Sequence, residues 1–507
     1  MAKELYDGIY SSHKLVFVEK IRRNLEFYLK DKARGIRILG QEIFFKADID
    51  DLAEVLKEIK KNPEIEVDIL TSINKYIVEK KCIVLLNLSS ISNNFSMIIE
   101  TALRSPAGNT ETFAAEYNKL IREINAIYES AAFYFEDLQT KDRQFDIVIR
   151  SHIIDGLDAF DTYIDAEDDI ITKANIDTRI SVIPFYSITR KIPVTELISK
   201  ISRFDYNAGI FPELCFCIAL EELMQLKVAK RIQFIRMLIS ELSRVANHLS
   251  YIAKMAAIMD SSIALSHILI EQERILRLIE LVTGSRVHPN YIRVGGVRKD
   301  LNEEKLKNIS SGISQLFQKI PKIESMLLDN AVITNKLKNK GSADRQTVLG
   351  CGVTGPNLRA SGARYDLRKN RNLLLYREVS FIVAVGKYGD CLERLYIRFR
   401  EIYQSIKIIE QLAGLMPDEH IRKLINLSEL DIPYNRMVSS IECPHGVFKI
   451  YFEIEGSTVL KLVVMGPSRN SLYLAQNILS GSAIDDIELI LASLDISSGE
   501  IMQELPA

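Results

Sequence analysis

The chain contains no tryptophan, and its six cysteines include no Cys-x-x-Cys pair. Secreted domains that depend on disulfides carry far more cysteine for their length, so we expect a reduced, cytoplasmic setting. No stretch reaches the roughly 18 consecutive apolar residues that a membrane-spanning helix needs, and the first residues contain no apolar signal core. Any membrane association is therefore expected to come through partner proteins.

Excess charge of either sign is also missing. Lys and Arg number 65 against 67 Asp and Glu, so no bulk field draws the chain to nucleic acid, and no nucleic-acid partner is expected. Apolar residues make up 47% of the chain, which is enough to form hydrophobic cores. A chain of 507 residues is too long to fold around a single core. We expect two or three domains.

Hydrophobic periodicity predicts an α+β fold, with a small mixed α/β domain at the N-terminus. Apolar spacing indicates helices over residues 15–29 and 48–60. Residues 82–88 read as a buried strand, with 96–103 as its partner. The polar stretch Lys141-Asp142-Arg143 marks a boundary, so domains are expected over 1–141 and 145–507.

The second domain is predicted to be mainly helical, with short strand regions. Its pattern changes from strand-like alternation to helical spacing and back again. The expected pieces are strands over 145–185, helices over 196–280, a long helical region within 373–415, a strand pair 437–440 with 448–454, and a helix over 471–479.

A loop rich in glycine, with one proline, spans Gly352 to Gly362 and is followed by Tyr365 to Lys369. Glycine allows close backbone approach and positive φ, and proline fixes the chain direction. Such a loop holds one conformation against another surface. The composition fits an ordered structural loop as well as a binding surface.

One predicted helix carries a polar ridge beside its apolar stripe. Glu241 and Arg244 are three residues apart, and Arg244 and His248 are four apart, so these side chains share one face. The ridge fits either of two interpretations: an ordinary solvated face, or a buried polar network that pins helices near a cofactor.

These segments together resemble the large D subunit of respiratory complex I, a relative of the large subunit of nickel–iron hydrogenases. The loop matches its GVTGP-LR-SG-DLRK signature, and the helix matches R-x-Q-x-x-R, E-x-x-R and N-H. Further collinear matches lie at 282–288 (VTGSRVH), 291–297 (YIRVGGV), 386–391 (GKYGDC), 442–446 (ECPHG) and 491–500, so that the resemblance runs from about 205 to 500.

The first 141 residues resemble a different subunit of the same complex. Residues 127–138 (IYESAAFYFEDL) look like the I-Y-x-x-A-x-W-x-E-R-E-x-x-D-L pattern of the C subunit, with Phe133 in place of tryptophan. A C-like segment before a D-like segment resembles the fused C/D subunit of some bacterial complexes I. The second domain would then have a fold like the hydrogenase large subunit.

The resemblance implies that this chain holds no metal. Nickel–iron hydrogenases bind their metals through two Cys-x-x-Cys pairs, because soft thiolates suit that site. Here residues 205–208 occupy the position of the first cysteine pair, and Ser497 and Glu500 occupy the position of the second pair. Cys215 and Cys217 lie nearby, but a one-residue spacing on a helix splays their sulfur atoms apart, which favours core packing.

The resemblance also implies two residues that face a quinone. Tyr206, in Arg203-Phe204-Asp205-Tyr206, matches D-R-L-D-Y, and a phenol can donate to a quinone oxygen. The alternative is a tyrosine packed at a helix start. His152 lies where the family has an H-P-x-x-H-G motif, and it is the second residue expected to donate to the quinone. Two features of the family are altered here. Residues 186–190 replace its H-R-G segment, and Ile258 replaces the aspartate that pairs with the quinone histidine, with Asp260 two residues further on. Quinone reduction therefore does not follow from the resemblance alone.

Arg231, Arg236 and His288 are implied to lie near an iron–sulfur cluster that a partner carries. A cationic group beside such a cluster favours its reduced, more negative form. The chain itself would bind no cofactor.

The function implied is that of a fused C/D-type subunit of a proton-pumping NADH-quinone oxidoreductase. It would lie peripherally on the cytoplasmic side of the cytoplasmic membrane, between a B-type iron–sulfur subunit and an H-type membrane subunit, with quinone as substrate. Two alternatives remain: a subunit of a hydrogenase-related energy-converting complex with another acceptor, and a non-catalytic scaffold that kept the interface and lost the redox pocket.

Overall fold

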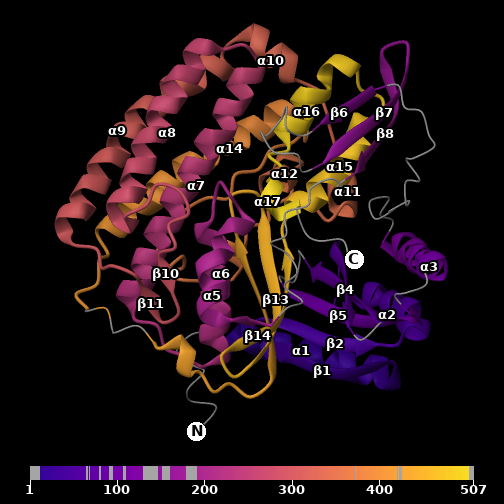
Figure 1. Ribbon diagram of the computed structural model, residues 1–507. Coiled ribbons are helices and arrows are strands. Elements are labelled where there is room, and N and C mark those ends of the chain that lie inside the picture. The colour runs from indigo at the N-terminus through magenta and orange to yellow at the C-terminus, as the bar shows by residue number, and fades with distance from the viewer. Residues whose placement is uncertain are drawn as a thin grey trace.

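The computed structural model describes residues 12–63, 65, 67, 69–78, 81–90, 95–106, 110–128, 147–150, 160–177, 191–371, 373–419, 421 and 425–501. An N-terminal sheet with its helices lies beside a larger part that combines a helical bundle with a second sheet (Figure 1). This is the predicted α+β fold. Among the described residues, no helix combines the length and apolar character that crossing a bilayer requires.

The N-terminal part is a five-stranded mixed sheet with three helices. The strand order is β1-β2-β5-β4-β3, and only β2 and β5 run parallel. The predicted helices correspond to α1 and α2, and the predicted strand pair is the antiparallel ladder β4–β5. The bounds are α1 Ser12–Leu29, β1 Ala33–Leu39, β2 Glu42–Ala47, α2 Ile49–Lys61, β3 Ile69–Val78, β4 Lys81–Ser90, β5 Phe95–Pro106 and α3 Thr110–Tyr128.

Strands β2, β4 and β5 have buried side chains on both faces of this sheet, and successive side chains alternate between the two faces. Phe45 and Leu86 belong to the main core on one face, while Phe44 and Leu85 belong to a second core on the other. The second core includes Tyr451 of the C-terminal sheet, whose ring stacks on Phe44 with centroids 6.2 Å apart. The two sheets are therefore held together by an apolar layer.

The predicted strands over 145–185 form a small antiparallel meander. It consists of β6 (Ile147–Arg150), β7 (Asp161–Glu167) and β8 (Ile170–Asp177), in that order. A backbone N–H of Ile171 donates to the Ser482 carbonyl at 2.9 Å, which attaches the meander to the end of helix α15 (Ser468–Leu479).

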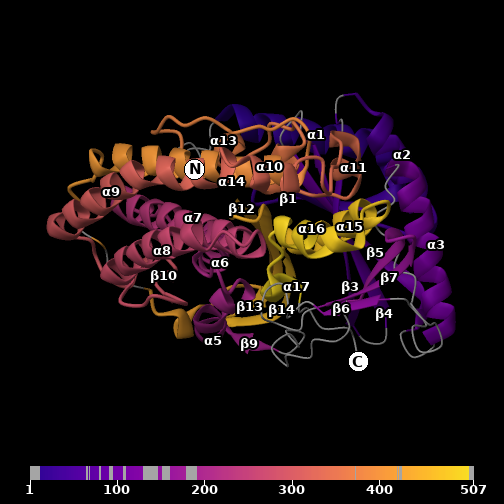
Figure 2. The same ribbon diagram turned by 90° about the horizontal axis from the view of Figure 1, so that it is seen from above.

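Four long helices form the bundle: α7 (Lys230–Ile258), α8 (Ser262–Thr283), α9 (Glu303–Leu328) and α14 (Cys391–Ala413). Helix α7 packs against both α8 and α14, and Figure 2 shows α7, α8 and α9 on the opposite side from α2 and α3. The expected helical region within 373–415 contains α14, which begins only at Cys391 because Asp390 caps it by accepting from the Glu393 N–H at 2.8 Å. Helix α9 was not predicted, although Leu306, Ile309, Ile313, Leu316 and Ile320 repeat with helical spacing along its buried face.

The predicted strand pair near the C-terminus is part of a larger sheet, ordered β12-β13-β14-β9. Its strands are β12 Asn435–Glu442, β13 Val447–Glu455, β14 Thr458–Met465 and β9 Ile192–Pro193. Short elements surround it and the bundle: α5 Val194–Lys200, η2 Ile201–Phe204, α6 Ile210–Leu223, β10 Ile292–Arg293, β11 Gly296–Val297, α10 Ala331–Leu337, α11 Arg345–Gly350, α12 Gly355–Ala360, α13 Leu367–Asn370, η3 Leu427–Glu429, η4 Ile484–Asp486, α16 Ile487–Ser493 and α17 Ser498–Ile501.

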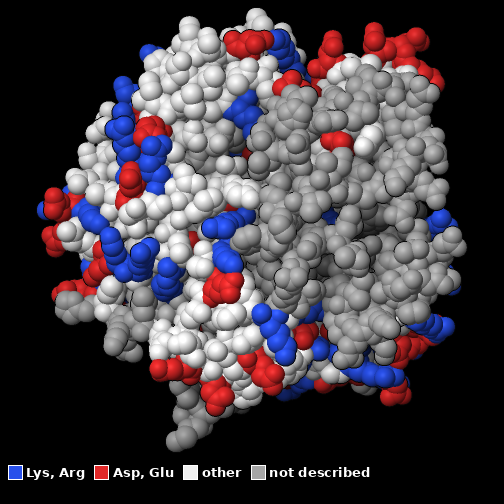
Figure 3. Space-filling view, viewed as in Figure 1, with Lys and Arg blue, Asp and Glu red and all other residues white. Residues whose placement is uncertain are grey.

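Basic and acidic side chains are interspersed over the described part of the face in Figure 3. This agrees with the near balance of charge along the chain.

Candidate functional site

Tyr206 lies in the turn between η2 and α6, beside the buried Asp205. Asp205 Oδ1 accepts hydrogen bonds of 3.1 Å from the N–H groups of Asn207 and Ala208, which shapes the approach to α6. The half-buried ring of Tyr206 meets the ring of His288 edge to face, with centroids 5.7 Å apart and planes at 71°. Two of the expected site residues are therefore direct neighbours.

His288 is held in an unusual conformation. Its φ is 51°, in the left-handed region, and its Nδ1 atom is buried with no hydrogen-bond partner among the described residues. Burial, and then the nearby Arg203, lower the pKa of this imidazole below its ordinary value. The ring is therefore neutral near pH 7 and has a free polar atom for a proton or a ligand.

Glu213 supports the loop that carries His288, and the sequence reasoning missed it. Its Oε2 accepts from the N–H groups of Tyr291 at 2.9 Å and Ile292 at 3.1 Å, while Oε1 has no partner within the described structure. Burial raises the pKa of Glu213 to about 7. The available signal was an acidic residue in an otherwise apolar helix, Ile210 to Leu220.

Arg231 and Arg236 both hold the loop that follows His288. The Arg231 guanidinium donates to Asp300 at 2.9 Å. Arg236 is buried, donates twice to Glu221 at 2.5 and 2.8 Å, and also reaches the Arg293 carbonyl at 2.8 Å. Both side chains are thus engaged inside the chain and stabilise the segment around β10 and β11.

The position of His152, the second expected quinone residue, relative to the Tyr206–His288 pair is not described. His152 and the altered segment 186–190 lie outside the described residues. Asp260 is exposed in the turn between α7 and α8, two residues beyond Ile258.

The polar ridge of α7 is buried, so the solvated interpretation is wrong. Glu241 and Arg244 have no exposed side-chain surface and contact each other at 3.3 Å. Glu241 also accepts from the hydroxyl groups of Tyr376 at 2.5 Å and Ser405 at 2.6 Å, and pairs with Arg368 at 3.3 Å. One carboxylate thereby joins α7, α13, α14 and the segment before α14.

A second group of buried hydrogen bonds and ion pairs begins at His248, on the same helix. His248 Nε2 lies 3.0 Å from Glu401, and Arg359 donates to Glu401 at 2.8 Å and to Glu442 at 2.7 Å. Although burial alone would raise the pKa of Glu401, Arg359 and then His248 hold it well below its usual range. Arg359 thus connects the glycine-rich loop to α14 and β12.

The network continues from His248 to Asp205, next to Tyr206. Arg398 lies 3.2 Å from His248 Nδ1 and 3.0 Å from Asp495. His445 then contacts Asp495 through Nδ1 at 3.2 Å and Asp205 through Nε2 at 3.5 Å. A continuous buried network therefore links the Tyr206 turn to the centre of the bundle.

The glycine-rich loop packs against the Glu442–Gly446 turn, a partner that its composition did not specify. Gly355 has a φ of 71°, and a Cβ there would fall 2.6 Å from the His445 carbonyl oxygen. The Val447 N–H donates to Thr354 Oγ1 at 2.9 Å. Only glycine permits this approach, so the loop is an ordered structural element of the site.

Glu42, on β2, joins the N-terminal sheet to the C-terminal sheet and to Arg371. It accepts from Lys449 at 2.8 Å, Arg371 at 2.9 Å and Ser440 at 2.9 Å. Burial alone would raise the pKa of Glu42, but Lys449 and then Arg371 lower it to about 2. The carboxylate is therefore charged, and it anchors the two parts to each other.

The chain is similar to proteins of known families. Residues 262–428 match the family model "Respiratory-chain NADH dehydrogenase, 49 Kd subunit". The chain is 34% identical over 331 residues to the D subunit of NADH-quinone oxidoreductase from Rickettsia typhi, covering 60% of this chain and 85% of that protein. The corresponding protein of Orientia tsutsugamushi is 34% identical, with 84% of it covered.

Among solved structures, the fold is similar to a chain of the membrane-bound sulfane sulfur reductase, an archaeal respiratory membrane complex. The TM-score is 0.68 at 27% identity, and the match covers 73% of this chain and all (100%) of the other. The identity to these curated relatives and the extent of the match show that the chain belongs to the D-subunit family of NADH-quinone oxidoreductases.

Proposed function

We propose that this chain is the D-type subunit of a membrane-associated NADH-quinone oxidoreductase and forms part of its quinone cavity. The observation that carries the proposal is the Tyr206–His288 pair, in which a half-buried phenol meets an imidazole with a free, buried nitrogen. The phenol donates a hydrogen bond to a quinone oxygen as that oxygen gains charge. His152 is the proposed second donor.

Electrons would come from an iron–sulfur cluster in a B-type partner subunit. Within this proposal, His288 faces the cluster side of the cavity, and Arg231 and Arg236 act by holding its loop through Asp300 and Glu221. Each guanidinium is compensated by a carboxylate, Arg231 by Asp300 and Arg236 by Glu221, so these two residues would act by positioning the loop. We further infer that the chain carries no nickel–iron centre, since such a centre needs thiolates in pairs.

The N-terminal sheet would be a C-type domain fused to the D-type part, over residues 1–141 and 145–507. The apolar layer around Phe44 and the buried Glu42 cluster support a permanent attachment, such as a fused subunit has. The assembly would lie peripherally on the cytoplasmic side of the membrane, against an H-type membrane subunit, and would couple quinone reduction to proton pumping.

The test is Tyr206→Phe in the assembled complex, with Tyr388→Phe as control, because the Tyr388 side chain is 57% exposed. We expect NADH oxidation with quinone to fall roughly a hundredfold. Oxidation with an artificial acceptor that takes electrons upstream should stay at the wild-type rate. Wild-type quinone turnover in Tyr206→Phe would remove the assigned role.

A second candidate is a nickel-free subunit of a hydrogenase-related energy-converting complex with another acceptor. The structural similarity to a chain of the sulfane sulfur reductase complex favours it, because the match covers 100% of that chain and 73% of this one. Supplying the purified assembly with a quinone or with a polysulfide separates the two, since only one of them should be reduced. If neither is reduced by an assembly that retains its clusters, the chain is a non-catalytic scaffold.

A further inference from the structure

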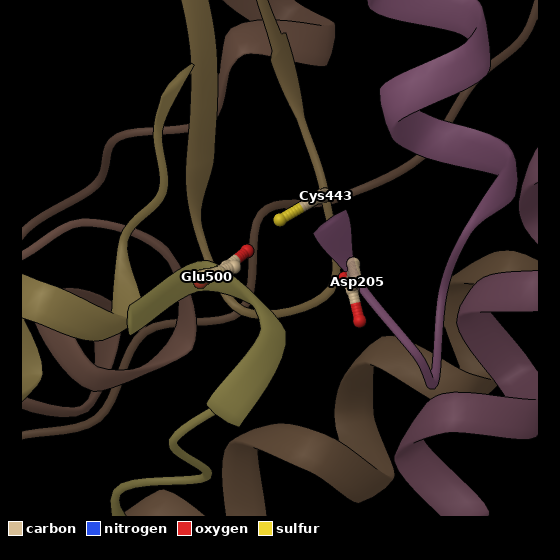
Figure 4. A group of neighbouring side chains, drawn as sticks. All are labelled: Asp205, Cys443 and Glu500. Carbon is tan, nitrogen blue, oxygen red and sulfur yellow. The ribbon is translucent and has the colours of Figure 1, made fainter. Parts of the chain in front are cut away.

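Three side chains from distant parts of the chain meet beneath the Tyr206 turn. Asp205 precedes α6, Cys443 follows β12, and Glu500 lies in α17 (Figure 4). One carboxylate oxygen of each acid and the sulfur atom of Cys443 lie within 4.8 Å of one another, and all three residues are buried. This group is called the Asp205–Cys443–Glu500 cluster below.

Each carboxylate in the cluster has one oxygen that accepts hydrogen bonds from backbone N–H groups and one oxygen that accepts no hydrogen bond within the described structure. Asp205 Oδ1 accepts the Asn207 and Ala208 N–H groups, and Glu500 Oε2 accepts the Ser468 N–H at 2.9 Å. Asp205 Oδ2 and Glu500 Oε1 are buried and have no hydrogen-bond partner among the described residues. Buried polar atoms without a partner are rare in proteins and call for a ligand or an ion.

A hydrogen bond from the Cys443 thiol cannot satisfy both of these carboxylate oxygens. Cys443 has a single S–H, so it can satisfy one of the two free oxygens and not both. The other nearby polar group is His445, whose Nε2 lies at an ion-pair distance of 3.5 Å from Asp205 Oδ2 without forming a hydrogen bond to it. The His445 ring is itself oriented by Asp495 at 3.2 Å.

We propose that the Asp205–Cys443–Glu500 cluster binds one divalent metal ion of the zinc class. One carboxylate oxygen of each acid and the Cys443 sulfur atom lie close enough together to share a cation. A thiolate with two carboxylates is a ligand set that Zn²⁺ accepts. The bound ion deprotonates the thiol, so loading releases a proton to solvent. His445 and Asp495 are the outer groups that orient a ligand, as histidine–carboxylate pairs commonly do around metals.

Such an ion would tie together the turn that carries Tyr206, the end of β12 and α17. This goes beyond the proposed redox function, because it requires neither quinone nor an iron–sulfur partner. It also replaces the expectation of a metal-free chain, which rested on the absence of Cys-x-x-Cys pairs. The three ligands stand at positions 205, 443 and 500, so no spacing in the sequence reveals them.

The test compares metal content between the native assembly and variants of this chain. Cys443→Ser keeps the size of the side chain but removes the thiolate, and Glu500→Gln removes one charged ligand. Cys351→Ser is the matched control, because Cys351 is also buried but lies outside the cluster. Elemental analysis should find one zinc per chain fewer in Cys443→Ser and Glu500→Gln than in wild type or Cys351→Ser.

Cobalt provides a second readout that does not depend on assembly. The full-length chain, stripped with a chelator and reloaded with Co²⁺, should show thiolate-to-cobalt charge-transfer absorption at one equivalent. The band should vanish in Cys443→Ser with an unchanged circular dichroism spectrum. A folded wild-type chain that takes up no stoichiometric Zn²⁺ or Co²⁺, or a band that persists in Cys443→Ser, overturns the proposal. Either result leaves the quinone assay of Tyr206→Phe unaffected, so the two proposals fail separately.

Discussion

The rings of Tyr206 and His288 meet edge to face, 5.7 Å apart between centroids, although one precedes α6 and the other follows α8. The contact depends on the loop after α8, whose backbone is held by Glu213 from α6. Helix α6 therefore supports both partners of the pair. The pair connects the expected quinone residue with the residue expected beside the cluster.

His288→Phe tests whether the imidazole nitrogens are needed. The substitution keeps an aromatic edge against Tyr206 and removes both nitrogens, including the free Nδ1 atom. We expect the complex to assemble and quinone reduction to fall roughly a hundredfold, because a proton-transfer partner is lost. His267→Phe, on α8, is the control for a general effect of losing a histidine. Full activity in His288→Phe alongside an inactive Tyr206→Phe would mean that the phenol works without the imidazole.

Glu213→Gln should change how stability depends on pH. In the folded chain the pKa of Glu213 is raised from 4.5 to about 7, so the folded state binds more protons across that window. Stability from this group is therefore present at low pH and is lost as pH rises toward 7. Glutamine keeps an oxygen for the Tyr291 and Ile292 N–H groups and carries no charge.

Denaturant unfolding at about pH 5 and about pH 8 measures this effect. Relative to wild type, Glu213→Gln should gain up to roughly 3 kcal/mol between the two conditions, since each pKa unit corresponds to about 1.4 kcal/mol. Glu410→Gln, an exposed change on α14, should show no such gain. A pH-independent difference would contradict the assigned protonation.

Arg359→Met should be strongly destabilising. The guanidinium is fully buried and compensates both Glu401 and Glu442, so its loss leaves two buried acids without their main partner. Breaking such a pair costs about 3–5 kcal/mol. Chemical denaturation should show this loss, whereas the exposed Arg364→Met should change the free energy of unfolding by less than about 0.5 kcal/mol. Equal stability of the two variants would mean that the network adds little to the fold.

Lys449→Met tests the attachment of the N-terminal sheet. Lys449 donates to Glu42 at 2.8 Å and to Asn87 at 2.5 Å, and so connects β13 with β2 and β4. Without it we expect a loss of about 3 kcal/mol at the interface and a separate, earlier unfolding transition of the N-terminal part. Calorimetry measures this, with the exposed Lys336→Met as control. A single transition at the wild-type temperature would assign the attachment to the apolar layer around Phe44 alone.

Local patterns predicted most of the elements that the structure contains. Helices α1 and α2, the β4–β5 pair, the meander β6–β8 and the long helix α7 follow from apolar spacing or from short continuous apolar runs. The same rule applies to α9, although its stripe was not among the predictions. The sheet around β12 was only half predicted, since β14 and the two-residue β9 pair with residues distant in the chain.

The sequence by itself determined the family, through spaced glycines and charges between about 205 and 500, and it singled out Tyr206 and His288. Only the tertiary structure decided that the α7 ridge is buried, that these two rings touch, and that Asp205, Cys443 and Glu500 converge. The physical reason is the distance along the chain over which each property is determined. Helical and strand periods depend on neighbours a few residues away, whereas burial of a charge depends on which distant elements pack over it.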